Sequence, residues 1–143
     1  MVWRLSMKWR AAVDRAVAPF GLTHAQYVLL ATLYGLSLRG ARPKQRELAE
    51  ATGLEPVYVS RLARALEDSH LIVRTEAAAD PRAVEITLTP QGEQVIVLAV
   101  DAVRRLHEEL LEPIGGQQSP DGRRFRGMLR ALLRESSEGG PLT

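Results

Sequence analysis

Apolar residues recur every three or four positions along most of this chain, which is the spacing of an amphipathic helix. The first such segment carries Val2, Leu5, Trp9 and Phe20, and the segment after Thr23 is apolar on most sides. The spacing predicts helices over 2–20, 23–37, 44–52, 55–69, 90–113 and 119–137.

Residues 72–88 change to a period of two, which is typical of half-buried strands. Two strands are expected, Ile72–Glu76 and Val84–Leu88, joined by an alanine-rich loop over 77–83. The predicted fold is therefore mainly α with a small β-hairpin wing.

Local signals agree with these helix ends. Thr23 and Gln26 have the spacing of a capping box, and Gly53 is expected to end the third helix in the left-handed conformation. Pro56 fits a first helical turn, and Thr89 is expected to cap the long helix that Pro90 opens.

The helix over 55–69 divides into two chemically different faces, given about 100° of rotation per residue. One face is apolar and consists of Val59, Leu62, Ala63 and Leu66. The other mixes small apolar, hydroxyl and basic side chains: Val57, Tyr58, Ser60, Arg61 and Arg64. That mixture suits contacts to thymine methyls and guanine edges. A solvated surface face is the alternative interpretation.

The stretch from Lys44 to Thr89 thus predicts helix, turn, helix and hairpin, an order whose main use is to place a helix in a DNA groove. Further DNA contacts are expected from the start of the helix over 44–52 and from the hairpin, where an arginine can enter the minor groove. The expected residues are Lys44, Gln45, Arg46, Arg74, Asp80 and Arg82.

Charge alone does not indicate DNA binding, because the net charge is only +2 with a pI near 9.4. Bases and acids nearly balance over 39–82, so binding has to depend on where the bases lie, and a moderate salt dependence is expected. Arginine makes up almost all of the basic residues, which fits bidentate contacts or a GC-rich genome.

Enzymatic chemistry is not expected. The chain has no cysteine and only three well-separated histidines, so neither a metal site nor a nucleophile–base pair is indicated, and no cofactor is predicted. No apolar run approaches the length that spans a bilayer, and the first ten residues do not resemble a signal peptide. A cytoplasmic protein without a membrane partner is expected.

The terminal helices carry more apolar surface than one small lobe can cover, which indicates a dimer interface. The predicted organisation is a single domain over 1–143. Helices 2–20 and 119–137 dimerise, 44–89 forms the DNA-binding lobe, and 90–113 connects the two parts.

In this order of elements the sequence resembles the MarR family of bacterial winged helix-turn-helix regulators. The resemblance covers nearly the whole chain and rests on short motifs whose order and spacing agree with the family: Leu22-Thr23-x-x-Gln26-Tyr27, Glu47-Leu48-Ala49, Val59-Ser60-Arg61-Leu62, Leu66-Glu67, Asp80-x-Arg82 and Leu88-Thr89-x-x-Gly92.

The resemblance implies a homodimer in which each subunit offers one recognition helix and one wing, with Asp80 steadying Arg82. It also implies a small anionic aromatic effector that releases DNA. The residues expected to line the effector pocket are Trp9, Arg10, His24 and Tyr27. The expected function is that of a sequence-specific repressor released from a palindromic operator.

Three positions depart from the family pattern. Ser69-His70 stands where a glycine commonly ends the recognition helix, Lys44 replaces a capping Ser or Thr, and the wing tip is nearly all alanine. The alternative function is a winged helix that binds DNA without sequence preference, or binds proteins, with no effector.

Overall fold

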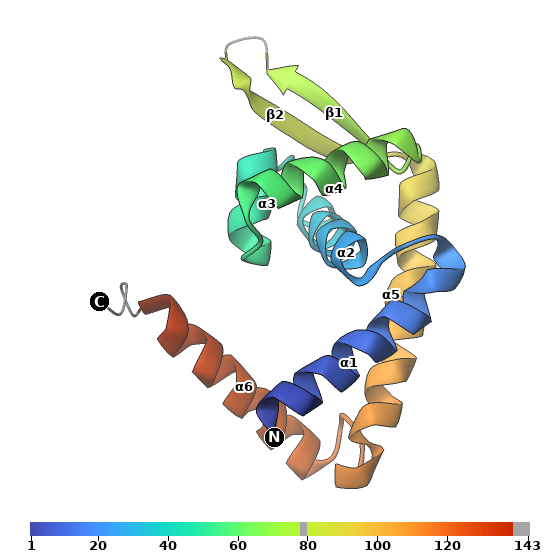
Figure 1. The fold of residues 1–143 in the computed structure, drawn as a ribbon, viewed down its shortest axis with the longest axis vertical. Helices are drawn as coiled ribbons and strands as arrows, with labels where there is room; N and C mark the ends of the chain where they lie inside the picture. The colour runs from blue at the N-terminus through green and yellow to red at the C-terminus, as the bar shows by residue number, and fades with distance from the viewer. Residues whose placement is uncertain (78–79, 139–143) are drawn as a thin grey trace. The chain divides into compact units, whose positions relative to one another are not determined.

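This computed structural model describes residues 1–77 and 80–138, and within them all side chains except those of 77, 80–82 and 135–138. The described part is mainly helical with one hairpin (Figure 1), which confirms the predicted fold class. The elements are α1 (Val2–Val17), η1 (Ala18–Phe20), α2 (His24–Leu38), α3 (Gln45–Thr52), α4 (Pro56–Asp68), β1 (Ile72–Ala77), β2 (Asp80–Leu88), α5 (Pro90–Leu111), η2 (Glu112–Ile114) and α6 (Pro120–Glu138).

The chain divides into two compact units, one over Met1–Val103 and one that begins at Arg104, inside α5. The first unit contains α1 to α4, the hairpin and the first part of α5. The second contains the end of α5, η2 and α6. The division of labour predicted for these segments, including a single domain over the whole chain, stays a prediction.

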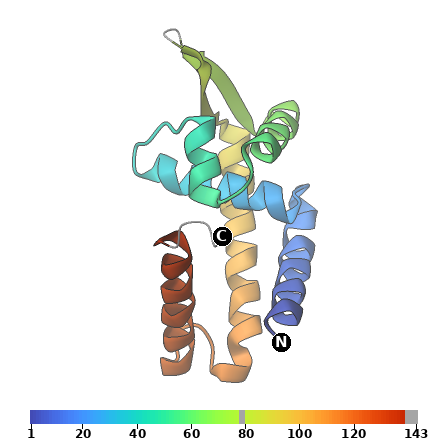
Figure 2. The same cartoon turned by 60° about the vertical axis from the view of Figure 1, so that its left-hand side comes forward.

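Helix α2 is the centre of the first unit, and it contacts α1, α3, α4 and β2. Its side chains Leu29, Leu30 and Leu33 are almost completely buried, because α2 is apolar on most sides and has neighbours around it. Figure 2 shows the hairpin projecting from this unit. The core thus supports α3, α4 and the hairpin together.

The hairpin pairs β1 with β2 in an antiparallel register that sets Ile72 opposite Leu88 and Arg74 opposite Ile86. Strand β2 begins at Asp80, so the loop predicted over 77–83 is wrong in extent. The register shifts between Glu76 and Ala77. Such a shift interrupts the period of two, and a sequence pattern therefore cannot show that pairing continues.

A short bridge adds to the hairpin in a way that the sequence did not predict. Lys44 pairs with Glu85 in an isolated antiparallel bridge, and the Ile86 N–H donates to the Pro43 carbonyl at 3.0 Å. The bridge ties the start of α3 to β2.

The end of α4 is closed by a left-handed residue, His70, with φ of 60°. The Leu71 N–H donates to the Leu66 carbonyl at 3.0 Å and the His70 N–H to the Glu67 carbonyl at 2.9 Å, which together form a Schellman motif. The departure at Ser69-His70 is therefore accommodated without loss of the helix stop. Gly53 likewise ends α3 with φ of 70°, as predicted.

Thr89 joins this turn to the start of α5. Its hydroxyl donates to the His70 carbonyl at 2.6 Å and accepts from the Gly92 N–H at 2.9 Å, which confirms the predicted cap. Gly92 is buried there, and a Cβ at this position would collide with the Leu71 carbonyl oxygen. Only glycine therefore lets α5 start this close to the α4–β1 turn.

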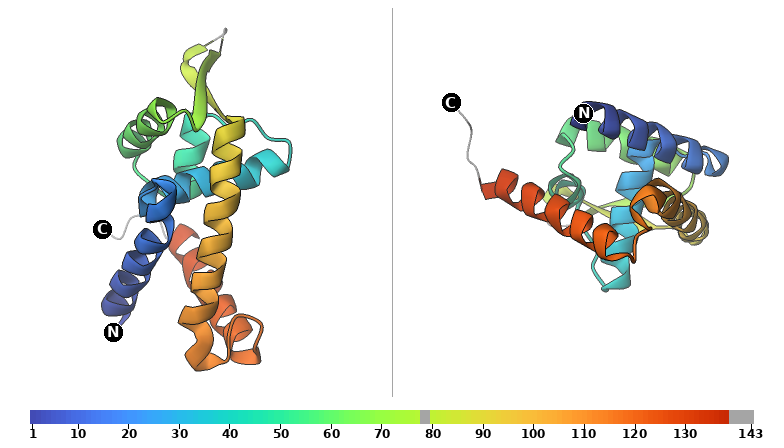
Figure 3. Two further views of the ribbon diagram at one scale, coloured as in Figure 1. Left: turned by 90° about the vertical axis from the view of Figure 1, so that its right-hand side faces the viewer. Right: turned by 90° about the horizontal axis from the view of Figure 1, so that it is seen from below.

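The predicted capping box of α2 is confirmed: the Gln26 N–H donates to the Thr23 hydroxyl at 3.2 Å, and the Thr23 N–H to Gln26 Oε1 at 3.0 Å. The next backbone N–H, that of His24, donates to Asp14 Oδ1 at 2.9 Å and so fastens α2 to α1. The segments Val2–Phe20 and His24–Leu38 are bent by 74° at this junction. Figure 3 shows the change of direction from α1 to α2.

Several apolar side chains remain exposed. In α1 only Ala12, Val13 and Val17 are buried. In α5 the buried residues of the first unit are Ile96, Ala99 and Val103, whereas Leu98 is exposed. The large apolar residues left exposed on the two terminal helices are Val2, Trp3, Leu5 and Met7 on α1 and Met128, Leu129, Leu132 and Leu133 on α6.

Among the described helices, none is by itself long and apolar enough to cross a membrane. The segments Val2–Phe20 and His24–Leu38 reach that composition only as a bent pair. The apolar character of α2 is explained by its burial in the core.

We predict that Gly92→Ala lowers the free energy of unfolding by about 1–3 kcal/mol, because the added methyl group meets backbone that cannot move aside easily. Gly35→Ala in α2 is the matched control, since a Cβ at Gly35 meets no atom within 4 Å. The control should be stabilising by about 0.5–1 kcal/mol. Urea unfolding measures both, and equal effects of the two substitutions would refute the close approach at Gly92.

We also predict that stability falls as the pH is lowered from about 7.5 to 5.5. Burial, and secondarily the charge of Arg10, lowers the pKa of His24, with Asp14 opposing. The unfolded chain therefore binds a proton at a higher pH than the folded chain does, and the stabilisation present above the unfolded pKa is lost as the pH falls. His24→Asn should reduce this slope, while His107, whose pKa is also lowered by burial, maintains part of it. A slope unchanged by His24→Asn in urea unfolding at several pH values would contradict the assignment.

Candidate nucleic-acid interface

The two faces of α4 are separated as the sequence predicted. Its inner face, formed by Val59, Leu62, Ala63 and Leu66, is buried. On the opposite face Val57 is 71% exposed, and Tyr58, Arg61 and Arg64 are exposed as well, with Ser60 half-buried. Burial of the inner face on α2, α3 and β1 requires the outer face to point away from the core.

The exposed face of α4 has side chains that are free to meet a partner. Within the described part of the chain, neither Arg61 nor Arg64 forms an ion pair or a side-chain hydrogen bond. The two arginines are three residues apart and therefore neighbours on the helix surface. An exposed valine and tyrosine beside them make a surface with both apolar and cationic groups, which is the composition that base edges and phosphates require.

The start of α3 contributes two further exposed cations, Lys44 and Arg46. Lys44 is the extended N-cap residue of α3, and its side chain makes no capping hydrogen bond. Arg46 lies 3.7 Å from Glu50, but both side chains are highly exposed, so this ion pair is weak and can open to a phosphate.

Arg74 lies away from this exposed face and is bonded within the lobe, and its predicted DNA contact stays a prediction. Its side chain is only 20% exposed, and its Nη2 donates to Gln45 Oε1 at 3.2 Å. Its Nη1 lies 4.0 Å from Glu67 Oε1. The Arg74 side chain has this low exposure because it lies opposite Ile86, on the face of the hairpin that packs inward. Gln45 is half-buried and shares that interaction.

The predicted wing residues Asp80 and Arg82 fall among those whose side chains lie outside the described part of the structure. Their backbone belongs to β2. Their roles stay predictions.

Two exposed arginines of the α2–α3 connector, Arg39 and Arg42, were not among the predicted contacts. The Arg42 Nε lies 4.0 Å from Glu85 Oε2, next to the bridge between Lys44 and Glu85. Two arginines in a connector that leads into α3 could have indicated further basic surface beside this helix. The pairing of Arg42 with Glu85 could not be predicted from the sequence, because the two residues are far apart in the chain.

The four predicted effector residues lie on α1 and α2. Trp9, His24 and Tyr27 are half-buried, Arg10 is exposed, and Arg10 is near enough to His24 to lower its pKa. Burial raises the pKa of Tyr27.

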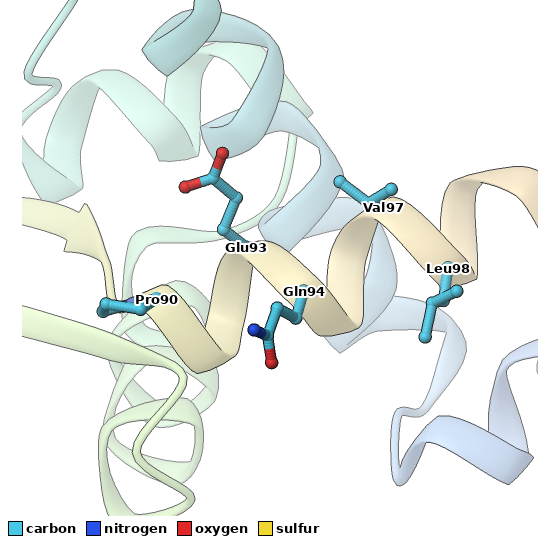
Figure 4. A pocket seen from close by; sticks show the side chains of 5 residues that line it. All are labelled: Pro90, Glu93, Gln94, Val97 and Leu98. Carbon is cyan, nitrogen blue, oxygen red and sulfur yellow. The ribbon is translucent and has the colours of Figure 1, made fainter.

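A separate hollow of about 630 Å³ lies on α5. Its lining side chains, shown in Figure 4, are Pro90, Glu93, Gln94, Val97 and Leu98. The structure therefore does not bring the four predicted residues into this hollow. Among the described residues no group of three His, Asp or Glu side chains could hold a metal ion.

Comparisons with known proteins agree with this geometry. The model of the MarR family matches residues 22–84. The uncharacterised HTH-type transcriptional regulator YdcH of Bacillus subtilis is 30% identical over 108 residues, covering 76% of this chain and 74% of that protein.

Two solved structures are similar over almost the whole chain. The transcriptional regulator MOSR of M. tuberculosis, in complex with DNA, has a TM-score of 0.71 and 28% identity, with 96% of both chains covered. CouR from Rhodococcus jostii, bound to p-coumaroyl-CoA, has a TM-score of 0.78 and 25% identity, covering 99% of this chain and 92% of that one. The family resemblance seen in the sequence is confirmed: the chain belongs to the MarR family, and the protein is a DNA-binding transcriptional regulator built on a winged helix-turn-helix.

Proposed function

We propose that the protein is a homodimeric, sequence-specific repressor that reads its operator with the exposed face of α4. The observation that carries this proposal is the segregation of α4 into a buried apolar face and an exposed face with two arginines that form no ion pair with any described residue. A helix that only covered the core would not need Val57 and Tyr58 beside those arginines at its exposed side.

Each exposed residue has a definite role in this proposal. Arg61 donates two hydrogen bonds to a guanine, Val57 contacts a thymine methyl, and Ser60 bonds to a base edge or phosphate. Tyr58 and Arg64 extend the same contact surface. Lys44 and Arg46 bind phosphates and fix the depth of α4 in the major groove. From the wing, Arg82 enters the minor groove and Asp80 holds it in place.

The dimer is formed by α1 and α6. Within its own unit each of these helices exposes four large apolar side chains, including Trp3 on α1 and Leu133 on α6. Apolar surface of this kind on a soluble domain marks an interface. A two-fold dimer carries two copies of α4, and its operator is then a palindrome.

The effector of this proposal is a small aromatic anion whose binding releases the DNA. Trp9 and Tyr27 offer aromatic faces, while Arg10 and His24 offer positive charge for the anionic group. The similarity to CouR, whose structure holds p-coumaroyl-CoA, supports an aromatic acyl compound as a first probe.

Arg61→Ala should weaken binding to the DNA upstream of the protein's own gene by about 1–3 kcal/mol, because it removes a base contact. Arg61→Lys is the matched variant: it keeps the charge but loses the bidentate fork, so it should keep affinity for random duplex and lose preference for the operator. Gel shifts at several salt concentrations measure both. Equal binding of wild-type protein to the upstream DNA and to random duplex would instead indicate non-specific binding.

Addition of p-coumaroyl-CoA or simple aromatic acids to the protein–operator complex should release DNA, and Arg10→Ala should raise the concentration required. The measurement is fluorescence anisotropy of a labelled operator. Arg15→Ala, also an exposed arginine of α1, is the control. Release at the same concentration from both variants would remove Arg10 from the effector site.

A further inference from the structure

Arg74 connects three elements of the DNA-binding lobe. From β1, its Nη2 reaches Gln45 on α3 at 3.2 Å, and its Nη1 lies 4.0 Å from Glu67 on α4. The backbone N–H of Arg74 also donates to Glu67 Oε2 at 3.0 Å. Side chain and backbone of one residue thus hold the hairpin to both helices of the helix-turn-helix.

This position is costly for an arginine. The side chain is only 20% exposed, and its Nε is buried without a hydrogen-bond partner among the residues that the structure describes. Burying a guanidinium is unfavourable unless its partners compensate, and an apolar side chain opposite Ile86 would avoid that cost. What an arginine supplies here is a planar fork whose two ends bind acceptors on two different helices.

The partners of Arg74 also set where the recognition face lies. Glu67 is in the last turn of α4, next to the Schellman motif that leads into β1. Gln45 is the first residue of α3, next to the bridge between Lys44 and β2. The three-residue cluster therefore fixes α3 and α4 against the hairpin at points where no regular backbone ladder connects them.

We propose that Arg74 is a positioning residue: held by Glu67 and Gln45, it sets the placement of the recognition face of α4 relative to the wing and does not touch DNA. The inference rests on the proposed function, because it concerns how the operator-reading surface is assembled. It assigns Glu67, an acidic residue, a favourable role in DNA binding.

The sign of the Glu67→Gln effect is the sharpest test. If electrostatics alone mattered, removal of an acid near the DNA-binding surface would strengthen DNA binding. Because Glu67 holds Arg74, we expect Glu67→Gln to weaken operator binding about tenfold, the size of a typical coupling within a contact network. This variant preserves the shape of the side chain, so it also serves if an Arg74 variant fails to fold.

Arg74 variants then separate positioning from phosphate contact. Arg74→Met and Arg74→Lys should weaken operator binding to a similar extent, since one ammonium cannot reach both acceptors in the guanidinium geometry. Neither should change the slope of affinity against salt. Arg64→Met, which removes an exposed arginine, should lower that slope by about one if Arg64 binds a phosphate. All affinities are measured well below the unfolding temperature, with the folded fraction determined from urea unfolding.

Three results would overturn the inference. Wild-type affinity of folded Arg74→Met would reduce Arg74 to a role in stability. A lowered salt slope in Arg74→Met, with Arg74→Lys binding like the wild type, would make Arg74 a phosphate contact. Stronger binding by Glu67→Gln would refute the favourable role of that acid. Failure of the proposed function is visible separately, as absence of operator preference in the wild-type protein in the same assay.

Discussion

The burial of one face of α4 against α2, α3 and β1 is the interaction on which the arrangement of the lobe depends. The inner face removes Val59, Leu62, Ala63 and Leu66 from water. Burial of a valine or leucine side chain contributes on the order of 1–3 kcal/mol to the free energy of folding. Because the helix is rigid, that burial also orients Val57 and Arg61 outward. One packing interaction therefore stabilises the lobe and presents the face that we propose reads DNA.

The proposed reading surface has to keep a fixed position relative to the hairpin and α5. Contacts at the ends of the helices and strands hold these elements together. His70 closes α4 in a left-handed turn, Thr89 bonds to its carbonyl, and Gly92 lets α5 start directly behind it. On the other side, Lys44 joins α3 to β2. Arg74 bonds to Gln45 and lies close to Glu67, and the positioning role that we propose explains why a charged residue is kept at a site that is only 20% exposed.

The sequence predicted features that depend on local rules. The faces of α4 follow from helical rotation, the capping box from Thr23 and Gln26, and the tolerance of His70 for positive φ from backbone sterics. It did not predict features that depend on distant pairing. Val73 is exposed and Arg74 faces inward because the pairing of β1 with β2 sets Arg74 opposite the buried Ile86. The Arg74–Gln45 contact joins residues 29 positions apart. Periodicity carries no information about such partners.

Selection of bound sites from a pool of random duplexes tests most directly whether two copies of α4 read DNA. An operator read by a two-fold dimer should appear as a palindrome whose half-sites are centred about one helical turn apart. Within each half-site, the positions under α4 should be the most strongly selected. Enrichment of a single unrepeated half-site, or no enrichment at all, would contradict sequence-specific reading by a dimer.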